Sequence, residues 1–189
     1  GITSASEELF KLMADGRAAY DNNFSMLLKG GSFKIPGFGD YLTKTLSKAN
    51  KFSLETVIRV KSLEQEGPAR IISLSQNPDS RNFTLGQSKN RLILRLRTPQ
   101  TGGNGTDPET DLCEISAGKP LHLIISYSPG NLVCFADGKK VLDTKSITGD
   151  FSNWGDQEFI IGDELTGGRA WFGAIDAIGI YSRTFTADE

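Results

Sequence analysis

A row of polar side chains on two neighbouring segments offers the most specific binding chemistry in this sequence. Asn82 and Thr84 lie in the segment NFTLGQ, and Arg95 and Arg97 lie in RLILRLR. Guanidinium groups beside amide and hydroxyl groups suit sugar hydroxyls or carboxylates. We therefore take the row as a candidate ligand-binding site. The alternative is a solvated sheet face, or an internal network that ties the arginines to backbone carbonyls.

Two tryptophans are candidates for stacking on the apolar face of a sugar. Trp154 lies in SNWGD and Trp171 lies in RAWFG. Phe172 and Ile175 flank the second tryptophan, which equally favours a structural role beneath a loop.

Acidic residues on both sides of the segment EFIIG are the candidate metal ligands. Asp150 and Asp156 precede it, and Asp163 and Glu164 follow it. Calcium takes hard oxygen ligands from loops, so it is the ion that these residues would hold. The dense alternation of a dedicated calcium loop is absent, which leaves solvated turn formers as the alternative. No other cofactor is expected.

Histidine and cysteine are too scarce for most metal or nucleophile chemistry. The single histidine, His122, lies inside the apolar run LHLIISY, where a strand position is a simpler interpretation than a catalytic base. Cys113 and Cys134 cannot build a zinc cage. They could pair as a disulfide, or Cys134 could be a free thiol packed among apolar residues.

A hairpin must form if the polar row is to share one sheet face. A two-residue turn at Lys89 and Asn90 separates apolar from polar side chains across the two strands. The expected pairs are Phe83 with Leu96, Leu85 with Leu94, Thr84 with Arg95, and Asn82 with Arg97.

Short apolar runs separated by turn residues predict strands along most of the chain. They are residues 52–60, 69–75, 82–87, 91–97, 121–127, 132–137, 158–162 and 170–182. Turns at SPGN and at Asp137-Gly138 should make a meander of the strands around them. The loop 98–111 has no apolar anchor, so we expect it to be mobile or ordered by a ligand.

The first thirty residues follow a different pattern. Ser4 and Glu7 have the spacing of a capping box, which predicts a short helix that ends at Gly16. A strand or irregular wrap is expected around residues 24–28, followed by a loop rich in Gly and Pro. We therefore divide the chain into a leader (1–30) and a domain (31–189).

Composition excludes several partners. With 189 residues, 38% of them hydrophobic, the chain has enough apolar mass for one core. A net charge of −2 gives no electrostatic footprint for nucleic acid. No run approaches the roughly 20 apolar residues that a membrane span needs, so we expect no membrane insertion by this segment.

The segments FSLETVIRV, LHLIISY, LVCFADGKKV and GAIDAIGIYSRTFTADE resemble the laminin-G-like domains of the concanavalin A-like lectin/glucanase superfamily. The closing motif comprises Gly173, Ile175, Asp176, Ile178, Ile180, Tyr181, Arg183, Phe185 and Glu189. The resemblance implies an all-β jelly-roll sandwich of two antiparallel sheets, one flat and one curved, behind the leader. GPARIISLS and IIGDELTGGRAWFG are further similar to a bacterial subgroup found in large multidomain proteins.

Glycoside hydrolases of this superfamily carry two paired acids in an E-x-D-x-x-E pattern. Around Asp176 in the closing motif, Ala174 and Gly179 stand where the other acids would be required. Glu109, Asp111 and Glu114 have the spacing, but they lie near turns and lack the alternation that would aim a pair into one cleft. The resemblance and the polar row therefore imply a non-catalytic, carbohydrate-binding module of a larger secreted or envelope protein. The alternatives are a structural or protein–protein interaction domain that docks neighbouring domains, and, third, a glycoside hydrolase.

Overall fold

The structure is a computed structural model that describes residues 11–186. In chain order, the elements are β1 (Met13–Tyr20), β2 (Met26–Lys34), α1 (Phe38–Ala49), β3 (Phe52–Val60), β4 (Ala69–Asn77), β5 (Ser80–Ser88), β6 (Arg91–Leu96), β7 (Thr110–Glu114), β8 (Pro120–Ser128), β9 (Asn131–Ala136), β10 (Lys139–Thr144), β11 (Glu158–Ile161) and β12 (Phe172–Tyr181). None of the described helices is long and apolar enough to cross a membrane.

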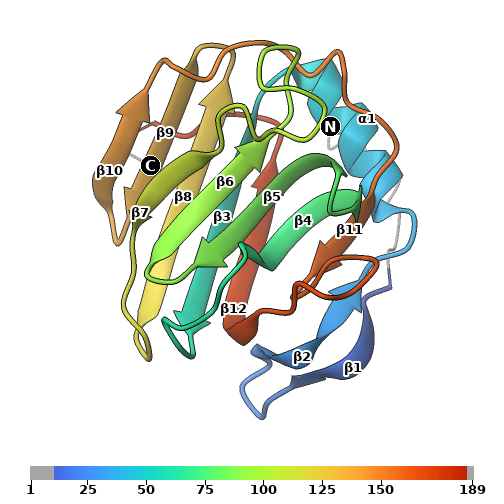
Figure 1. The fold of residues 1–189 in the computed structure, drawn as a ribbon, viewed down its shortest axis with the longest axis vertical. Coiled ribbons are helices and arrows are strands. Elements are labelled where there is room, and N and C mark those ends of the chain that lie inside the picture. Colours follow the sequence, from blue (N-terminus) through green and yellow to red (C-terminus); the bar gives the residue numbers. More distant parts are fainter. Residues whose placement is uncertain (1–10, 187–189) are drawn as a thin grey trace, which may run out of the picture.

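The strands form one continuous sheet that bends back over itself. Its order is β10-β9-β8-β3-β12-β2-β11-β4-β5-β6-β7, and β1 pairs with β2. Every pair of named strands in it is antiparallel. Figure 1 shows β4, β5, β6 and β7 lying across β8, β3 and β12. We call the first group the front layer and β10, β9, β8, β3 and β12 the back layer.

The prediction of an all-β, antiparallel fold is confirmed, but its division into two separate sheets is not seen in the described residues. The short strand β11 pairs with β4 along its length and with β2 through Ile160 and Ile161. Because β2 also pairs with β12, hydrogen bonds run from one layer into the other.

Both expected hairpins are confirmed. Phe83 pairs with Leu96, Thr84 with Arg95 and Leu85 with Leu94. Asn82 faces Arg97, whose backbone N–H donates to the Asn82 carbonyl at 2.8 Å. Ser128 pairs with Asn131 and Ala136 with Lys139, which places the two tight turns of the meander where the sequence predicts them.

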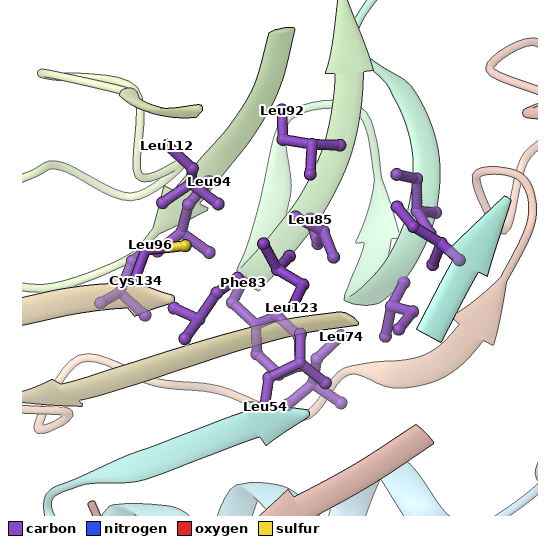
Figure 2. Close-up of a cluster of buried hydrophobic side chains, with 14 of the residues drawn as sticks. Leu54, Leu74, Phe83, Leu85, Leu92, Leu94, Leu96, Leu112, Leu123 and Cys134 are labelled. Carbon is purple, nitrogen blue, oxygen red and sulfur yellow. The ribbon is translucent and has the colours of Figure 1, made fainter. Parts of the chain in front are cut away.

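The core fills the space between the layers. Leu74, Phe83, Leu85 and Leu94 from the front layer point toward Leu54 and Leu123 from the back layer, as Figure 2 shows. These side chains are at most 1% exposed. The face of the front layer that carries Thr84 and Arg95 therefore turns away from the core.

The N-terminal region differs from its prediction. Most of the expected helix falls on residues 1–10, outside the described residues, and from Met13 the chain is strand β1 instead. Gly16 lies inside that strand, beside an irregularity in its pairing with β2. Strand β2 spans residue 30, where we expected the leader to end, and it contains the glycines that we assigned to a loop.

Helix α1 was not predicted from the sequence. Its buried Leu42 and Leu46 close one end of the core, and the backbone N–H of Asn50 caps it by donating to the Leu46 carbonyl at 2.8 Å. Asn50 has a φ of 53°, a left-handed conformation that Asn tolerates better than most residues.

Two threonines within the loop 98–111 hold it in place by burial and hydrogen bonding. Thr98 and Thr101 are at most 2% exposed. The Thr101 hydroxyl donates to the Leu96 carbonyl at 2.6 Å and accepts from the Thr98 backbone N–H at 2.8 Å. Two buried threonines thus take the place of the apolar side chain that the loop lacks. Strand β7 begins at Thr110, before the expected end of the loop at residue 111.

Candidate functional site

Strand pairing brings the predicted polar row together, but half of it is buried. Thr84 is fully buried and hydrogen-bonds the Ser73 hydroxyl at 3.0 Å. Asn82 is also fully buried, and its side chain donates to the Gly155 carbonyl at 2.8 Å and accepts from the Gly155 N–H at 3.1 Å. Both side chains serve internal contacts, as in the alternative interpretation of the row.

The two arginines of the row lie nearer to solvent. Arg95 forms an ion pair with Glu109 at 2.8 Å, and its side chain is 18% exposed. Arg97 is half-buried, and its Nε has no hydrogen-bond partner. These two residues are the part of the row that can meet a ligand.

Both predicted tryptophans are held by internal contacts, although Trp154 is only half-buried. Trp171 is fully buried, and its indole N–H donates to the Gln87 side-chain oxygen at 2.8 Å. Trp154 stacks on Phe151 with ring centroids 4.1 Å apart and donates to the Arg97 carbonyl at 2.7 Å. Trp154 therefore lies beneath the arginine end of the row.

The four acidic candidates are dispersed. Asp150 is exposed and accepts hydrogen bonds from Ser152, which lower its pKa. Asp156 is exposed, Asp163 accepts the Glu164 and Arg169 backbone N–H groups, and Glu164 pairs with Arg70. Across residues 11–186, no three His, Cys, Asp or Glu side chains group closely enough to hold a metal ion. Calcium binding stays a prediction.

An exposed aromatic side chain lies next to Trp171 in the sequence. Phe172 is 36% exposed because consecutive residues of an extended chain point to opposite sides. Gln65 fixes it by accepting the Phe172 backbone N–H at 2.6 Å and donating to the Phe172 carbonyl at 3.0 Å. Gln65 also donates to Gln87 at 2.9 Å, the residue that holds Trp171. Phe172 is thus anchored to the buried polar network around Trp171.

A polar pocket of about 260 Å³ lies between the hairpin of β1 and β2 and the loop after β11. Asp15, Ser32 and Lys34 from the hairpin and Asp163 and Glu164 from the loop line it. Gly31 lets β1 approach closely, because a Cβ there would lie 2.3 Å from the Asp15 carbonyl oxygen. A Cβ on Gly30, which also lines the pocket, would be in ordinary contact with the Phe172 ring, at 3.7 Å. We call this space the glycine pocket.

A second pocket, of about 390 Å³, has Phe172 in its wall. It is lined by Lys61, Ser62, Glu64, Gln65, Glu66, Ala170 and Phe172. We call it the glutamine pocket. The Phe172 ring therefore lies beside hydrogen-bonding side chains such as Ser62 and Gln65, an arrangement that can hold a ligand with an apolar face and a polar rim.

The sequence carried a signal for Phe172. In the segment 170–182, Trp171 and the buried Ile175 share one parity and Phe172 has the other, so alternation alone assigns Phe172 to the outer side. The pocket glycines had no such signal because the pockets depend on strands and loops far apart in the chain.

His122 belongs to a surface network. Its Nε2 donates to one Glu55 carboxylate oxygen at 2.8 Å, and the Tyr181 hydroxyl donates to the other at 2.9 Å. The bond from His122, followed by that from Tyr181, lowers the pKa of Glu55. The strand position expected for His122 is confirmed, because it lies on β8 and is held by Glu55 of the neighbouring strand β3.

Cys113 and Cys134 are both buried and free. They approach each other from β7 and β9, and their hydrogen bond lowers the pKa of Cys113 and raises that of Cys134.

The fold and the sequence together place the chain among known proteins. Residues 37–189 match the profile of a laminin G family described as the concanavalin A-like lectin/glucanases superfamily. The chain belongs to this family, which confirms the resemblance. Comparison with curated protein sequences finds no match.

Several solved structures share the fold at low sequence identity. A botulinum neurotoxin type C, whose cell entry depends on interaction with two ganglioside molecules, has a TM-score of 0.69 and 16% identity over 95% of this chain and 44% of its own. The binding domain of botulinum neurotoxin DC, in complex with rat synaptotagmin II, has a TM-score of 0.69 and 14% identity over 95% and 45% of the two chains. This chain thus spans less than half of these neurotoxin chains.

A third similar structure is matched over most of its length. It is domain 4 of AbnA, an extracellular GH43 arabinanase from Geobacillus stearothermophilus, in complex with arabinotriose. The TM-score is 0.67 and the identity 16%, over 95% of this chain and 84% of that one. Identities this low establish a common fold alone. Any ligand of this chain must be inferred from its own residues.

Proposed function

We propose that this chain is a non-catalytic carbohydrate-binding module of a larger secreted or envelope protein. The observation that carries the proposal is the exposed Phe172 ring, held by Gln65 in the wall of the glutamine pocket and near Gly30 of the glycine pocket. A sugar ring presents C–H groups on its faces and hydroxyl groups at its rim. The Phe172 ring would take the apolar face, and the carboxylates, lysines and backbone groups of the pockets would bond the hydroxyls.

Two further facts support this proposal. The superfamily of this chain is named for lectins and glucanases, and domain 4 of the arabinanase, which has the same fold, is in complex with arabinotriose. Glu109, Asp111 and Glu114 have the spacing of the glucanase acids, but each accepts a hydrogen bond from the neighbouring strand or turn. Acids engaged in such pairs favour binding without hydrolysis. No cofactor is required, because hydrogen bonds and stacking suffice for such recognition.

The test is a calorimetric titration of the chain with neutral oligosaccharides, including arabino-, gluco- and galacto-oligosaccharides. For a sugar that binds, Phe172→Ala should weaken the affinity at least tenfold, which corresponds to about 1.4 kcal/mol. Phe24→Ala is the matched control, because Phe24 is 83% exposed and lines neither pocket. Equal affinities of the two variants, or no binding of any sugar to the intact chain, would contradict the proposal.

A protein-docking role is the second candidate function. Met13 and Tyr20 on β1 and Phe24 in the following turn are at least 51% exposed. Such apolar side chains gathered around one hairpin favour a protein surface as their partner. If this is the function, substituting Met13 and Tyr20 with Ser should abolish binding to a neighbouring domain of the full-length protein, and Phe172→Ala should leave it intact.

A further inference from the structure

Arginine side chains gather on the face of the front layer that turns away from the core. Arg70 and Arg81 come from β4 and β5 and are at most 1% exposed. Arg95 pairs with Thr84 across the hairpin, and Arg97 follows two residues later on the same side. The charges of Arg70 and Arg95 act directly on Arg81. We call Arg70, Arg81, Arg95 and Arg97 the arginine cluster.

Two members of the cluster have carboxylate partners. Arg70 Nε bonds Glu164 at 3.1 Å, and its Nη1 donates to the Pro68 carbonyl at 2.8 Å. Arg95 bonds Glu109, whose side chain is 43% exposed. The Ser75 hydroxyl shares the Glu164 carboxylate, which leaves Glu164 little capacity for another arginine.

The other two members have side-chain nitrogens without a hydrogen-bond partner. Arg81 Nη2 donates to the Pro78 carbonyl, but its Nε and Nη1 are buried without a hydrogen bond, as is Arg97 Nε. Burial, and then the charges of Arg70 and Arg95, lower the pKa of Arg81 to about 10, so this guanidinium stays charged at neutral pH. A buried charged donor without an acceptor is costly, and native proteins rarely keep one.

The surroundings do not neutralise the cluster. In the described part of the chain, Glu164, Asp79 and Arg169 act on Arg70 or Arg81 from outside the cluster, and Glu109 pairs with Arg95. The arginines therefore outnumber the carboxylates. Water could accept hydrogen bonds from Arg81, but it would leave this excess positive charge in place.

We propose that the arginine cluster is an oxyanion-binding site, which takes a carboxylate, sulfate or phosphate group between Arg81, Arg95 and Arg97. Guanidinium groups match the oxygens of such groups in geometry and charge, and a bound anion would fill the donors that are left open. The partly exposed Arg95 and Arg97 form the approach to Arg81. Glu109 on Arg95 is a competing carboxylate of the chain itself.

Glu164 links the two regions, because it lines the glycine pocket and pairs with Arg70. The tests use different residues, Phe172 for the sugar and Arg95 and Arg97 for the anion, so the two proposals can fail independently. If the module binds carbohydrate at Phe172, an oxyanion site favours a glycan that carries acidic groups. If it binds no neutral sugar, the anion site is unaffected.

The experiment measures thermal unfolding and calorimetric binding with sodium glucuronate, sodium sulfate and sodium phosphate, each against sodium chloride at constant ionic strength. We expect a saturable rise in Tm with at least one of them. Arg97→Gln and Arg95→Gln should each weaken the affinity at least tenfold. Glu109→Gln should strengthen it several-fold, because it removes the competing carboxylate.

Arg91→Gln is the matched control. Arg91 lies on the same strand and pairs with Asp111 at 2.7 Å, as Arg95 pairs with Glu109, but it is outside the cluster. It should bind the anion as the unmodified chain does. A preference for glucuronate assigns the ligand to a carboxylated sugar, and a preference for sulfate or phosphate assigns it to a tetrahedral anion.

Three outcomes would overturn the proposal. They are a rise in Tm that does not saturate, a rise of equal size in Arg95→Gln and Arg97→Gln, and an equal loss in Arg91→Gln. Because Arg95 and Arg97 are partly exposed, their variants should fold, and the test does not depend on replacing the buried Arg81.

Discussion

At the scale of single residues, the ion pair between Arg70 and Glu164 is buried and depends on both charges being present. Both side chains are at most 1% exposed, and Ser75 adds a hydrogen bond to the carboxylate. Desolvation costs such a pair much of its attraction, so its net contribution to stability is small while both charges are present. Removing one charge leaves the other buried and uncompensated.

Glu164→Leu should therefore lower the free energy of unfolding by about 3–5 kcal/mol, measured by urea denaturation. The exposed pair of Lys140 and Asp143 is the control: Asp143→Ala should cost about 1 kcal/mol or less. The double variant Arg70→Met/Glu164→Leu should recover most of the loss. If Glu164→Leu costs no more than Asp143→Ala, the pair does not have this role.

The network of Glu55, His122 and Tyr181 makes stability depend on pH. Its hydrogen bonds lower the pKa of Glu55 in the folded state below the unfolded value of about 4.3. A depressed pKa gives stability that is present above the unfolded pKa and is lost as the pH falls through the folded one. The free energy of unfolding of the native chain should thus exceed that of Glu55→Gln near neutral pH, and this difference should shrink from about pH 5 downward. Urea titrations at several pH values test this, and a difference that does not change with pH would contradict it.

The positions of individual site residues were predictable where they depend on residues nearby in the sequence. Thr84 and Arg95 face each other because a two-residue turn fixes their register. The burial of Arg81 was not predictable, because it depends on an irregularity in the pairing of β5 with β4 and on Glu164, which comes from a loop far along the chain.

At the scale of elements, backbone conformation decides which turns tolerate substitution. Asp137 and Gly138 have φ values of 49° and 75°, as a type I′ turn requires. Gly155 is an ordinary loop glycine without a positive φ. A Cβ added at Gly138 or at Gly155 would meet nothing within 4 Å. The two positions therefore differ in backbone strain and not in available space.

Gly138→Ala should lower the free energy of unfolding by about 1 kcal/mol, because an L-residue resists the left-handed conformation. Gly155→Ala should change it by less than about 0.5 kcal/mol. Urea denaturation of the two variants compares them directly. Equal losses would show that the turn does not need glycine for its φ.

Secondary-structure elements, like single residues, were predictable where the signal lies in neighbouring residues of the sequence. Strands with alternating or continuous apolar runs, such as β3 and β6, are found within a residue of their expected ends. The helix α1 was missed because only Leu42 and Leu46 mark its buried side, while Gly39 interrupts its first turn. Gly39 is required there because a Cβ would lie 2.0 Å from the Gln157 carbonyl oxygen, a contact that no local pattern reveals.

At the scale of the whole molecule, sheet order could not be derived from the sequence. Hairpins such as β8–β9 follow from short turns, but β3 pairs with β12 from the far end of the chain. The position of β2 is the clearest case. A segment rich in glycine gives a weak strand signal, yet it contributes the fully buried Leu28 and Phe33 to the core.

The family profile begins at residue 37 and so leaves out β2, although β2 pairs with β12 through residues 26–29 and with β11 through Phe33 and Lys34. We expect a chain that starts at residue 37 to lose cooperative folding, because it lacks two core side chains worth about 2–5 kcal/mol each and the pairing partner of β11. Strand β1 is almost wholly exposed. A chain that starts at Asn23 should therefore keep one cooperative urea transition and the amide NMR dispersion of the intact chain. Cooperative unfolding of the shorter chain would show that the layers hold together without β2, and that the profile already marks the folding unit.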